Sequence, residues 1–225
     1  MYKKLGILGG MGPLATYTLY RNIIENTPAS SDQEHIDMVI LNASRIPDRT
    51  AGILGRKESP LPYLLDALKN LEVCGCDLIA VPCNTSHYYY DQMQEGCKVK
   101  ILNMPDLTAE ALAESGIREV YLMATEATVK TGVYQRFFDL RGVGILTPRD
   151  EEIAEMMRVI YDIKAGGAPE LSKLEEMARQ YGLPVVLGCT EFSAVKFKSI
   201  KCIDAMNVLQ EKILELFRVN RVNVK

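Results

Sequence analysis

The stretch LIAVPCNTSH (Leu78–His87) returns later in the chain, in altered form, as PVVLGCTEF (Pro184–Phe192). Each copy is a short apolar run that ends in a cysteine followed by small hydroxyl or amide residues. Short apolar runs bounded by such residues are typical of buried strands in a parallel sheet. The chain therefore repeats one unusual strand ending, with Cys83 in the first copy and Cys189 in the second.

Two further pairs of segments follow the same order. LGILGGMGPLATYTLY (Leu5–Tyr20) is similar to VYLMATEATVKTGVY (Val120–Tyr134), and each reads as a strand, a turn of small residues and a helix that ends in tyrosine. VKILNMPDLTAEAL (Val99–Leu112) is similar to IKCIDAMNVLQEKIL (Ile200–Leu214), and each reads as a strand that runs straight into a helix. Three correspondences in one order predict an internal duplication.

The rest of the chain fits an α/β fold, because short β-branched or apolar runs alternate with longer segments of helical period. Apolar spacing predicts helices through Leu14–Ile24 and Leu61–Leu71. Two more are predicted over Glu151–Lys164, with Asp150 as its cap, and over Pro169–Tyr181, which opens on its proline. The predicted strands are Lys4–Leu8, Asp37–Leu41, Leu78–Val81, Lys100–Leu102, Glu119–Met123, Gly144–Leu146, Val185–Leu187 and Lys201–Ile203.

Composition narrows the class of partner to a small molecule. The 225 residues are 48% apolar, the formal net charge is −3, and no block of Lys or Arg stands out, which argues against nucleic acid or an anionic membrane as partner. Glycines and a proline interrupt the first apolar run too early for a signal peptide or membrane span, so a cytoplasmic protein is expected. The six cysteines lack paired CxxC spacing, which disfavours structural zinc and predicts free thiols.

The repeated cysteines predict the chemistry. Ligand sites of βαβ units lie outside the carboxyl ends of the strands, so Cys83 and Cys189 are expected to face one another across a single cleft. Two acid/base groups on opposite faces of a carbon suit racemisation or epimerisation. A free thiol has a pKa of about 8.5, and a helix N-terminus lowers it, so each thiol is expected to be poised near neutral pH. Asn84, Thr85 and Thr190 are capping residue types, and turn N–H groups beside them would bind a carboxylate.

Four motifs in order, GILGGMGPLATYTLY, SRIPDRT with ILG after it, PCNTSH and GCTE, resemble the cofactor-independent aspartate/glutamate racemase superfamily, and in particular its aspartate racemase branch. The resemblance covers nearly the whole chain. It implies two pseudo-symmetric, Rossmann-like α/β domains with mainly parallel sheets and the active site in the cleft between them. We place the first domain at 1–103 plus 205–225 and the second at 104–204. The resemblance also implies no pyridoxal phosphate, no metal, and a homodimer.

The motifs shared with this superfamily also imply which residues form the site. The resemblance makes Cys83 and Cys189 the two catalytic bases, and Arg49 and Lys164 the groups that face the side-chain carboxylate of a small dicarboxylic amino acid. GCTE in place of the GCTH usual in glutamate racemases favours aspartate. Departures from the family pattern are Asn103, Ala205 and Met206. Further substrate-binding residues, in loops that line the site, are Met11, Asn84, Thr85, Thr125 and Thr190.

Several alternatives stay open. The protein could be a glutamate or broader amino-acid racemase, an isomerase or decarboxylase of another small dicarboxylic acid, or a non-catalytic amino-acid binding protein. The glycines at 9, 10 and 12 lack GxGxxG spacing, which favours a carboxylate-binding turn over a nucleotide site. Arg49 could be a solvated surface charge. His87 suits packing or hydrogen bonding better than a metal site, and Glu191 could orient Cys189 or Thr190, or cap backbone donors.

Overall fold

The computed structural model describes residues 2–222, with side chains described as far as Phe217. In these residues, two four-stranded sheets carry the fold, and every strand pairing is parallel. The predicted α/β class and all eight predicted strands are confirmed, each strand to within one residue at either end. The strands are β1 (Lys4–Gly9), β2 (Asp37–Asn42), β3 (Leu78–Ala80), β4 (Lys100–Ile101), β5 (Glu119–Ala124), β6 (Gly144–Leu146), β7 (Val185–Gly188) and β8 (Cys202–Asp204).

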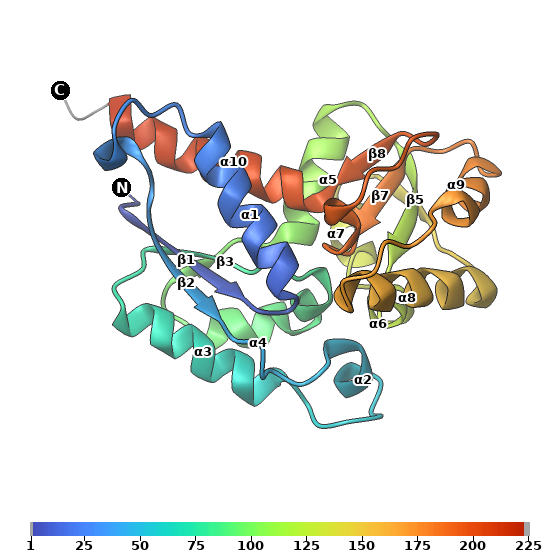
Figure 1. The fold of residues 1–225 in the computed structure, drawn as a ribbon, viewed down its shortest axis with the longest axis horizontal. Helices are drawn as coiled ribbons and strands as arrows, with labels where there is room; N and C mark the ends of the chain where they lie inside the picture. Colours follow the sequence, from blue (N-terminus) through green and yellow to red (C-terminus); the bar gives the residue numbers. More distant parts are fainter. Residues whose placement is uncertain (1, 223–225) are drawn as a thin grey trace.

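The two sheets have the same strand order. The first runs β2-β1-β3-β4 and the second β6-β5-β7-β8. The three sequence correspondences therefore fall on equivalent strands, β1 with β5, β3 with β7 and β4 with β8. Figure 1 shows the two sheets side by side, the first in blue and green and the second in green to red. This equivalence is the structural counterpart of the predicted duplication.

Helices cover both faces of each sheet because successive strand residues point to opposite sides. In β5, for example, Tyr121 and Met123 pack against α8 and α9, whereas Val120 and Leu122 pack against α5 and α7. The helices are α1 (Pro13–Asn26), α2 (Arg49–Ile53), α3 (Leu61–Val73), α4 (Tyr90–Glu95), α5 (Met104–Glu114), α6 (Glu126–Lys130), α7 (Gln135–Leu140), α8 (Asp150–Lys164), α9 (Ser172–Arg179) and α10 (Ala205–Val222), with short 3-10 turns η1 (Asp32–Glu34), η2 (Asn84–Tyr89) and η3 (Phe192–Ala194).

The last helix, α10, returns to the first sheet. Leu209 and Ile213 are fully buried in one cluster with Leu5 of β1 and Leu19 of α1. Each such buried side chain contributes about 1.5–3 kcal/mol relative to an exposed one. Figure 1 shows α10, in red, running beside α1, in blue. This packing supports our proposal that the first domain takes in the chain from residue 205; residue 1 and residues 223–225 of that domain lie outside the described residues.

The cap predicted for one helix and the start predicted for another are wrong. Asp150 is the first residue of α8, and Arg149 occupies the cap position, where its backbone N–H donates to Glu152 at 2.7 Å. The predicted helix from Pro169 begins at Ser172, and its first buried residue is Leu174. The intervening chain first turns through Gly166, whose φ is +81°. No helix within residues 2–222 has the length and apolar character needed to span a bilayer.

Candidate active site

The two repeated cysteines lie just beyond the carboxyl ends of equivalent strands. Cys189 directly follows β7, and Cys83 follows β3 by three residues. Both are buried, with 6% of Cys83 and 4% of Cys189 exposed. They line one cavity together with every substrate-binding residue expected from the sequence and three more, Asp48, Thr50 and Glu191. The residues expected from the sequence are Met11, Arg49, Cys83, Asn84, Thr85, Thr125, Lys164, Cys189 and Thr190.

The cavity is small. It offers about 10 Å³ to water, which is room for about one water molecule. An amino acid does not fit this space, so the surrounding segments must move apart before a substrate enters. A larger, mostly apolar chamber of about 570 Å³ adjoins it and shares Asp48, Arg49, Lys164 and Glu191 with it. These four residues therefore line both the small cavity and the larger chamber.

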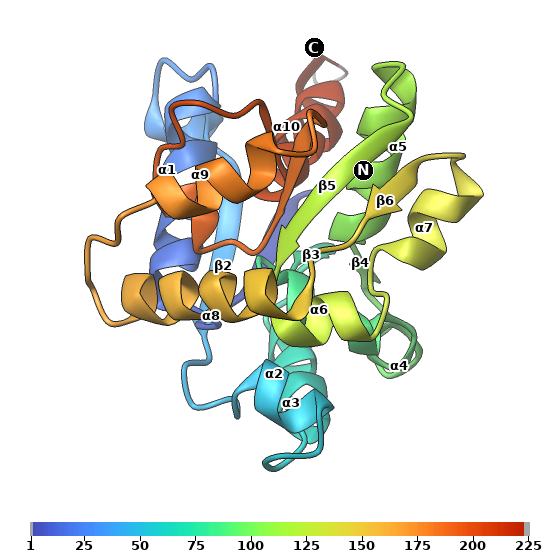
Figure 2. The same ribbon diagram turned by 90° about the vertical axis from the view of Figure 1, so that its right-hand side faces the viewer.

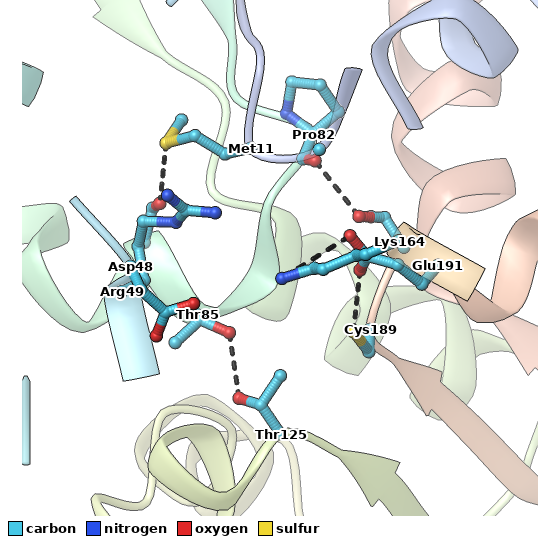
Figure 3. Close-up of polar contacts among 12 residues, drawn as sticks. Met11, Asp48, Arg49, Pro82, Thr85, Thr125, Lys164, Cys189 and Glu191 are labelled. Atoms are coloured by element: carbon cyan, nitrogen blue, oxygen red, sulfur yellow. Dashed lines mark hydrogen bonds and ion pairs between the residues drawn. The ribbon is translucent and has the colours of Figure 1, made fainter. Parts of the chain in front are cut away.

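A carboxylate and an ammonium group surround one thiol (Figure 3). The Cys189 thiol donates to Glu191 Oε2 at 3.0 Å, and Lys164 Nζ lies 3.8 Å from Glu191 Oε1. Burial, followed by the charge of Glu191, raises the pKa of Cys189 well above its ordinary value. Our expectation of a lowered pKa is therefore wrong for Cys189. Cys189 precedes a 3-10 turn of three residues, η3, and no α-helix begins at it, so burial dominates.

Lys164 remains charged in this setting. Burial opposes its positive charge, but Glu191 and the two cysteines outweigh burial and raise the pKa of Lys164. Lys164 is the last residue of α8, and its side chain is 27% exposed on the chamber side. The ammonium group thus sits at the boundary of the cavity, where it would meet an anionic ligand.

Arg49 opens α2, a short helix capped by Asp48 through the Ala51 N–H at 2.8 Å. Its Nη1 donates to the carbonyl oxygens of Ile46 and Pro47 at 3.0 and 2.9 Å. Its Nε is buried and has no hydrogen-bond partner among the described residues. With 8% exposure, Arg49 is no solvated surface charge, and that alternative is wrong.

Three threonine hydroxyls form a buried ring across the two halves. Thr85 and Thr125 lie 2.9 Å apart, Thr125 and Thr128 also 2.9 Å, and Thr128 donates to Thr85 at 3.2 Å. Figure 3 shows the contact between Thr85 and Thr125. Hydroxyls can rotate, so this ring can redirect its donors toward an anion that enters the cavity. The sequence did not predict a role for Thr128, because the contacts of its hydroxyl with Thr85 and Thr125 depend on how α6 packs.

His87 is a structural residue. It is 3% exposed, its Nδ1 lies 3.0 Å from the Cys83 carbonyl oxygen, and its Nε2 accepts from the Met104 N–H at 3.2 Å. Burial lowers the pKa of His87, which keeps the ring neutral. The expected hydrogen-bonding role is confirmed. Within residues 2–222, no three His, Cys, Asp or Glu side chains gather as a metal site would require.

The glycine turn after β1 contributes residues to both spaces. Met11 lines the small cavity, and Gly10 and Gly12 line the larger chamber. The Gly10 N–H donates to Thr16 Oγ1 at 2.8 Å, so this amide is engaged inside the turn. Gly10 has a φ of +88°, and a side chain there would meet the backbone of Ala43. The turn is therefore built for tight packing.

The three departures from the family pattern lie outside the cavity lining. Asn103 caps α5 by accepting the Asp106 N–H at 3.2 Å. Ala205 and Met206 are the first two residues of α10 and are fully buried in the core against the first sheet. These residues therefore serve helix capping and core packing, and the cavity residues expected from the motifs are all present.

Comparison with known proteins identifies the family of this chain. Residues 8–211 match the family described as Asp/Glu/Hydantoin racemase. The chain belongs to this racemase family. It is 27% identical over 202 residues to the broad specificity amino-acid racemase RacX of Bacillus subtilis, over 85% of this chain and 86% of that protein.

Solved structures of racemases share its fold. An aspartate racemase from Picrophilus torridus superposes with a TM-score of 0.81 at 29% identity, over 95% of this chain and 94% of that one. An aspartate racemase homologue from Pyrococcus horikoshii gives 0.74 at 28%, over 95% and 98%. A glutamate racemase from Francisella tularensis gives 0.70 at 17%, over 100% and 84%, which is evidence of the fold alone. The predicted fold is confirmed, and the protein is an isomerase of the Asp/Glu racemase type.

Proposed function

We propose that this racemase interconverts L- and D-aspartate by proton transfer between two thiols. The observation that carries the proposal is a single buried cavity lined by Cys83, Cys189 and two cationic side chains, Arg49 and Lys164. Two thiols provide the acid and the base, and two cations select a second carboxylate. The Picrophilus and Pyrococcus relatives support aspartate as the substrate.

The proton balance is simple. In one direction the Cys83 thiolate takes the α-proton and becomes a thiol, while the electron pair passes into the substrate carboxylate as an enolate-like charge. Cys189, as a thiol, gives its proton to the opposite face of the α-carbon and becomes a thiolate. The reverse reaction exchanges these roles. The raised pKa of Cys189 suits the direction in which it begins as the acid.

The carboxylates would bind at opposite sides of the cavity. Hydrogen-bond donors of Asn84, Thr85 and Thr125 would hold the α-carboxylate and the charge that develops on it. Arg49, whose Nε is buried without a partner among the described residues, would hold the side-chain carboxylate with Lys164. A charge-assisted contact of this type is about twice as strong as a neutral hydrogen bond.

Glu191 gives Cys189 a route to its thiolate. Its Oε2 already accepts the thiol proton, so transfer along this contact yields a thiolate and a neutral carboxyl. The Lys164 ammonium at 3.8 Å offsets the charge of Glu191 before that transfer. We infer that Glu191 returns Cys189 to its basic form between turnovers.

The decisive experiment is proton NMR of L- and D-aspartate in D₂O. The wild-type protein should exchange the α-proton and form the other enantiomer. Cys83→Ala and Cys189→Ala should each stop racemisation, while each keeps slow exchange of one enantiomer, a different one in each variant, because one base remains. Cys76→Ala is the matched control, because Cys76 is a buried cysteine that packs with residues of the first sheet and α3 and does not line the cavity. Absence of exchange by the wild-type protein would exclude aspartate racemisation.

The adjoining chamber supports a second candidate, a broader amino-acid racemase. Its apolar lining includes Leu14, Ile46 and Ile163, and it begins at the cations that would hold the side-chain carboxylate. A longer side chain could pass between Arg49 and Lys164 into this space. RacX, which is described as a broad specificity racemase, supports this reading. The same NMR assay with alanine, leucine and glutamate distinguishes the two candidates.

A further inference from the structure

The side chains of Tyr134 and Asn84 meet across the two halves of the molecule. Tyr134 lies between α6 and α7 of the second half, and Asn84 directly follows Cys83 in the first. The Tyr134 hydroxyl donates to Asn84 Oδ1 at 2.5 Å. Tyr134 is fully buried, and Asn84 is 1% exposed. Asn84 lines the cavity, and Tyr134 lies behind it.

This contact orients the amide. An asparagine side chain has an oxygen that accepts and a nitrogen that donates, which lie in one plane and point to opposite sides of the Cβ–Cγ bond. Because Tyr134 engages the oxygen, the Asn84 nitrogen faces away from Tyr134. That nitrogen is buried and has no hydrogen-bond partner among the described residues. Buried donors are nearly always satisfied in folded proteins, so an unsatisfied donor in a cavity lining indicates a ligand acceptor.

Packing fixes the tyrosine in turn. Its ring contacts Phe138 edge to face, with centroids 5.3 Å apart. Gly188, the residue before Cys189, leaves room for the ring, since a Cβ there would lie 3.2 Å from Tyr134 Cε2. Burial raises the pKa of Tyr134, so its hydroxyl keeps the proton that it donates. Tyr134 is thus a rigid, neutral donor.

We propose that Tyr134 is a positioning residue that holds the Asn84 amide with its NH₂ group toward the α-carboxylate of the substrate. The inference rests on the proposed function and adds a residue outside the cavity lining to it. Without the tyrosine hydroxyl, the amide can rotate and present its oxygen to the carboxylate, which repels it. Tyr134 therefore governs substrate affinity without touching the substrate.

A double-mutant cycle tests this role. Tyr134→Phe keeps the ring and should raise the KM for L-aspartate about tenfold, the scale of a lost hydrogen bond to a charged group. Asn84→Ala should raise it by at least as much. In the Asn84→Ala background, Tyr134→Phe should change KM by less than about twofold, because coupled residues are not additive. Tyr121→Phe, in another fully buried tyrosine of the second half, is the control and should leave KM unchanged.

Two results would overturn the inference. An unchanged KM in Tyr134→Phe with a lowered melting temperature would make the hydroxyl a folding element alone, and fully additive effects in the cycle would uncouple the two residues. Asn84→Asp serves as a second variant, since it keeps an acceptor for Tyr134 and loses the donor to substrate. Its KM should rise as in Asn84→Ala.

A further measurement keeps this inference separate from the proposed function. In protein labelled with ¹⁵N-asparagine, the Asn84 NH₂ signals are identified by their loss in Asn84→Ala. Their hydrogen exchange should be faster in Tyr134→Phe than in the wild-type protein. If the wild-type protein does not exchange the α-proton of aspartate, the proposed function fails, while this readout still tests the hydrogen bond from Tyr134 to Asn84. Hydrogen exchange of the Asn84 amide that is unchanged in Tyr134→Phe would overturn the inference.

Discussion

The Thr190 hydroxyl donates to the Pro82 carbonyl oxygen at 3.2 Å, so the residue after one cavity cysteine is tied to the residue before the other. The contact is buried and crosses from the second half of the molecule to the first. It fixes the separation of the Cys83 and Cys189 loops more directly than the sheets do, because the sheets have no shared strand. Figure 3 labels Pro82, whose carbonyl oxygen accepts this hydrogen bond.

Removing this hydroxyl should impair both directions of the reaction equally. Thr190→Val keeps the shape of the side chain, and we expect kcat/KM to fall about tenfold, the scale of one buried hydrogen bond whose acceptor is left unpaired. The two enantiomers of aspartate have equal free energy, so the ratio of the two kcat/KM values must stay at one. Thr131→Val is the control, since its hydroxyl donates to Ala127 outside the cavity lining. An unchanged kcat/KM would show that the tie is dispensable.

Neutralising Glu191 should lower the pKa of Cys189. Burial raises that pKa first and the Glu191 charge adds to it, so in Glu191→Gln the thiolate should form at lower pH. The ultraviolet absorbance of thiolate, compared between Glu191→Gln and Glu191→Gln with Cys189→Ser, measures this shift. Racemisation should nevertheless slow by about 10²-fold in both directions, because the proton acceptor is lost. A thiolate titration identical to the wild type would contradict the assigned contact.

Lys164 should discriminate between substrates by charge. Lys164→Met is similar in length and uncharged, and we expect it to reduce kcat/KM for aspartate about tenfold to a hundredfold, the scale of a lost charged hydrogen bond. Alanine, if it is a substrate, should be affected far less. Lys173→Met removes an exposed lysine that pairs with Glu155, and serves as the control. Equal reductions in kcat/KM for aspartate and alanine would show that Lys164 does not recognise the side-chain carboxylate.

An ion pair at the cavity edge should control opening. Arg56 pairs bidentately with Glu126 at 2.7 and 2.8 Å, which ties the segment after α2 to the start of α6 beside Thr125. Figure 2 shows α2 lying next to α6. Because the pair would hold the cavity together around a bound substrate, Glu126→Gln should raise the KM for aspartate by up to about fivefold, the range of exposed ion pairs, and reduce its dependence on salt. Glu155→Gln is the control, since Glu155 of α8 pairs with Lys173 of α9. A salt dependence of KM equal to that of the wild type would exclude a role of the Arg56–Glu126 pair in opening.

The same pair predicts a dependence of stability on pH. Hydrogen bonds from Arg56 and Lys130 hold the pKa of Glu126 at about 2, below its ordinary 4.5. Its contribution to stability is therefore complete above about pH 4.5 and is lost as the pH falls toward 2. In melting experiments, the wild-type protein and Glu126→Gln should differ above pH 4.5 and converge on acidification. A constant difference would contradict this assignment.

The sequence predicted the strands and the cavity residues more fully than the helix ends and the contacts between halves. Short apolar runs such as Val185–Leu187 are set by burial, which is visible in composition. The start of α9 depends on how the chain turns at Gly166, which periodicity does not encode. Tyr134 was matched with Tyr20 in the repeat, yet Tyr134 is fully buried and Tyr20 is 38% exposed. Whether a tyrosine is buried or exposed depends on what the other half of the molecule packs against it, and local sequence does not contain that information.

The equal strand order of the two sheets has an evolutionary consequence. A doubled ancestor with identical halves would have offered two equal bases, which suits mirror-image substrates, but also two equal walls, which do not suit a carbon bearing four different groups. Divergence therefore had to fall beside the cysteines and spare them. The residues after Cys83 are an amide and a hydroxyl, and those after Cys189 are a hydroxyl and a carboxylate. Selection on such a gene would keep the bases alike while it drove their neighbours apart.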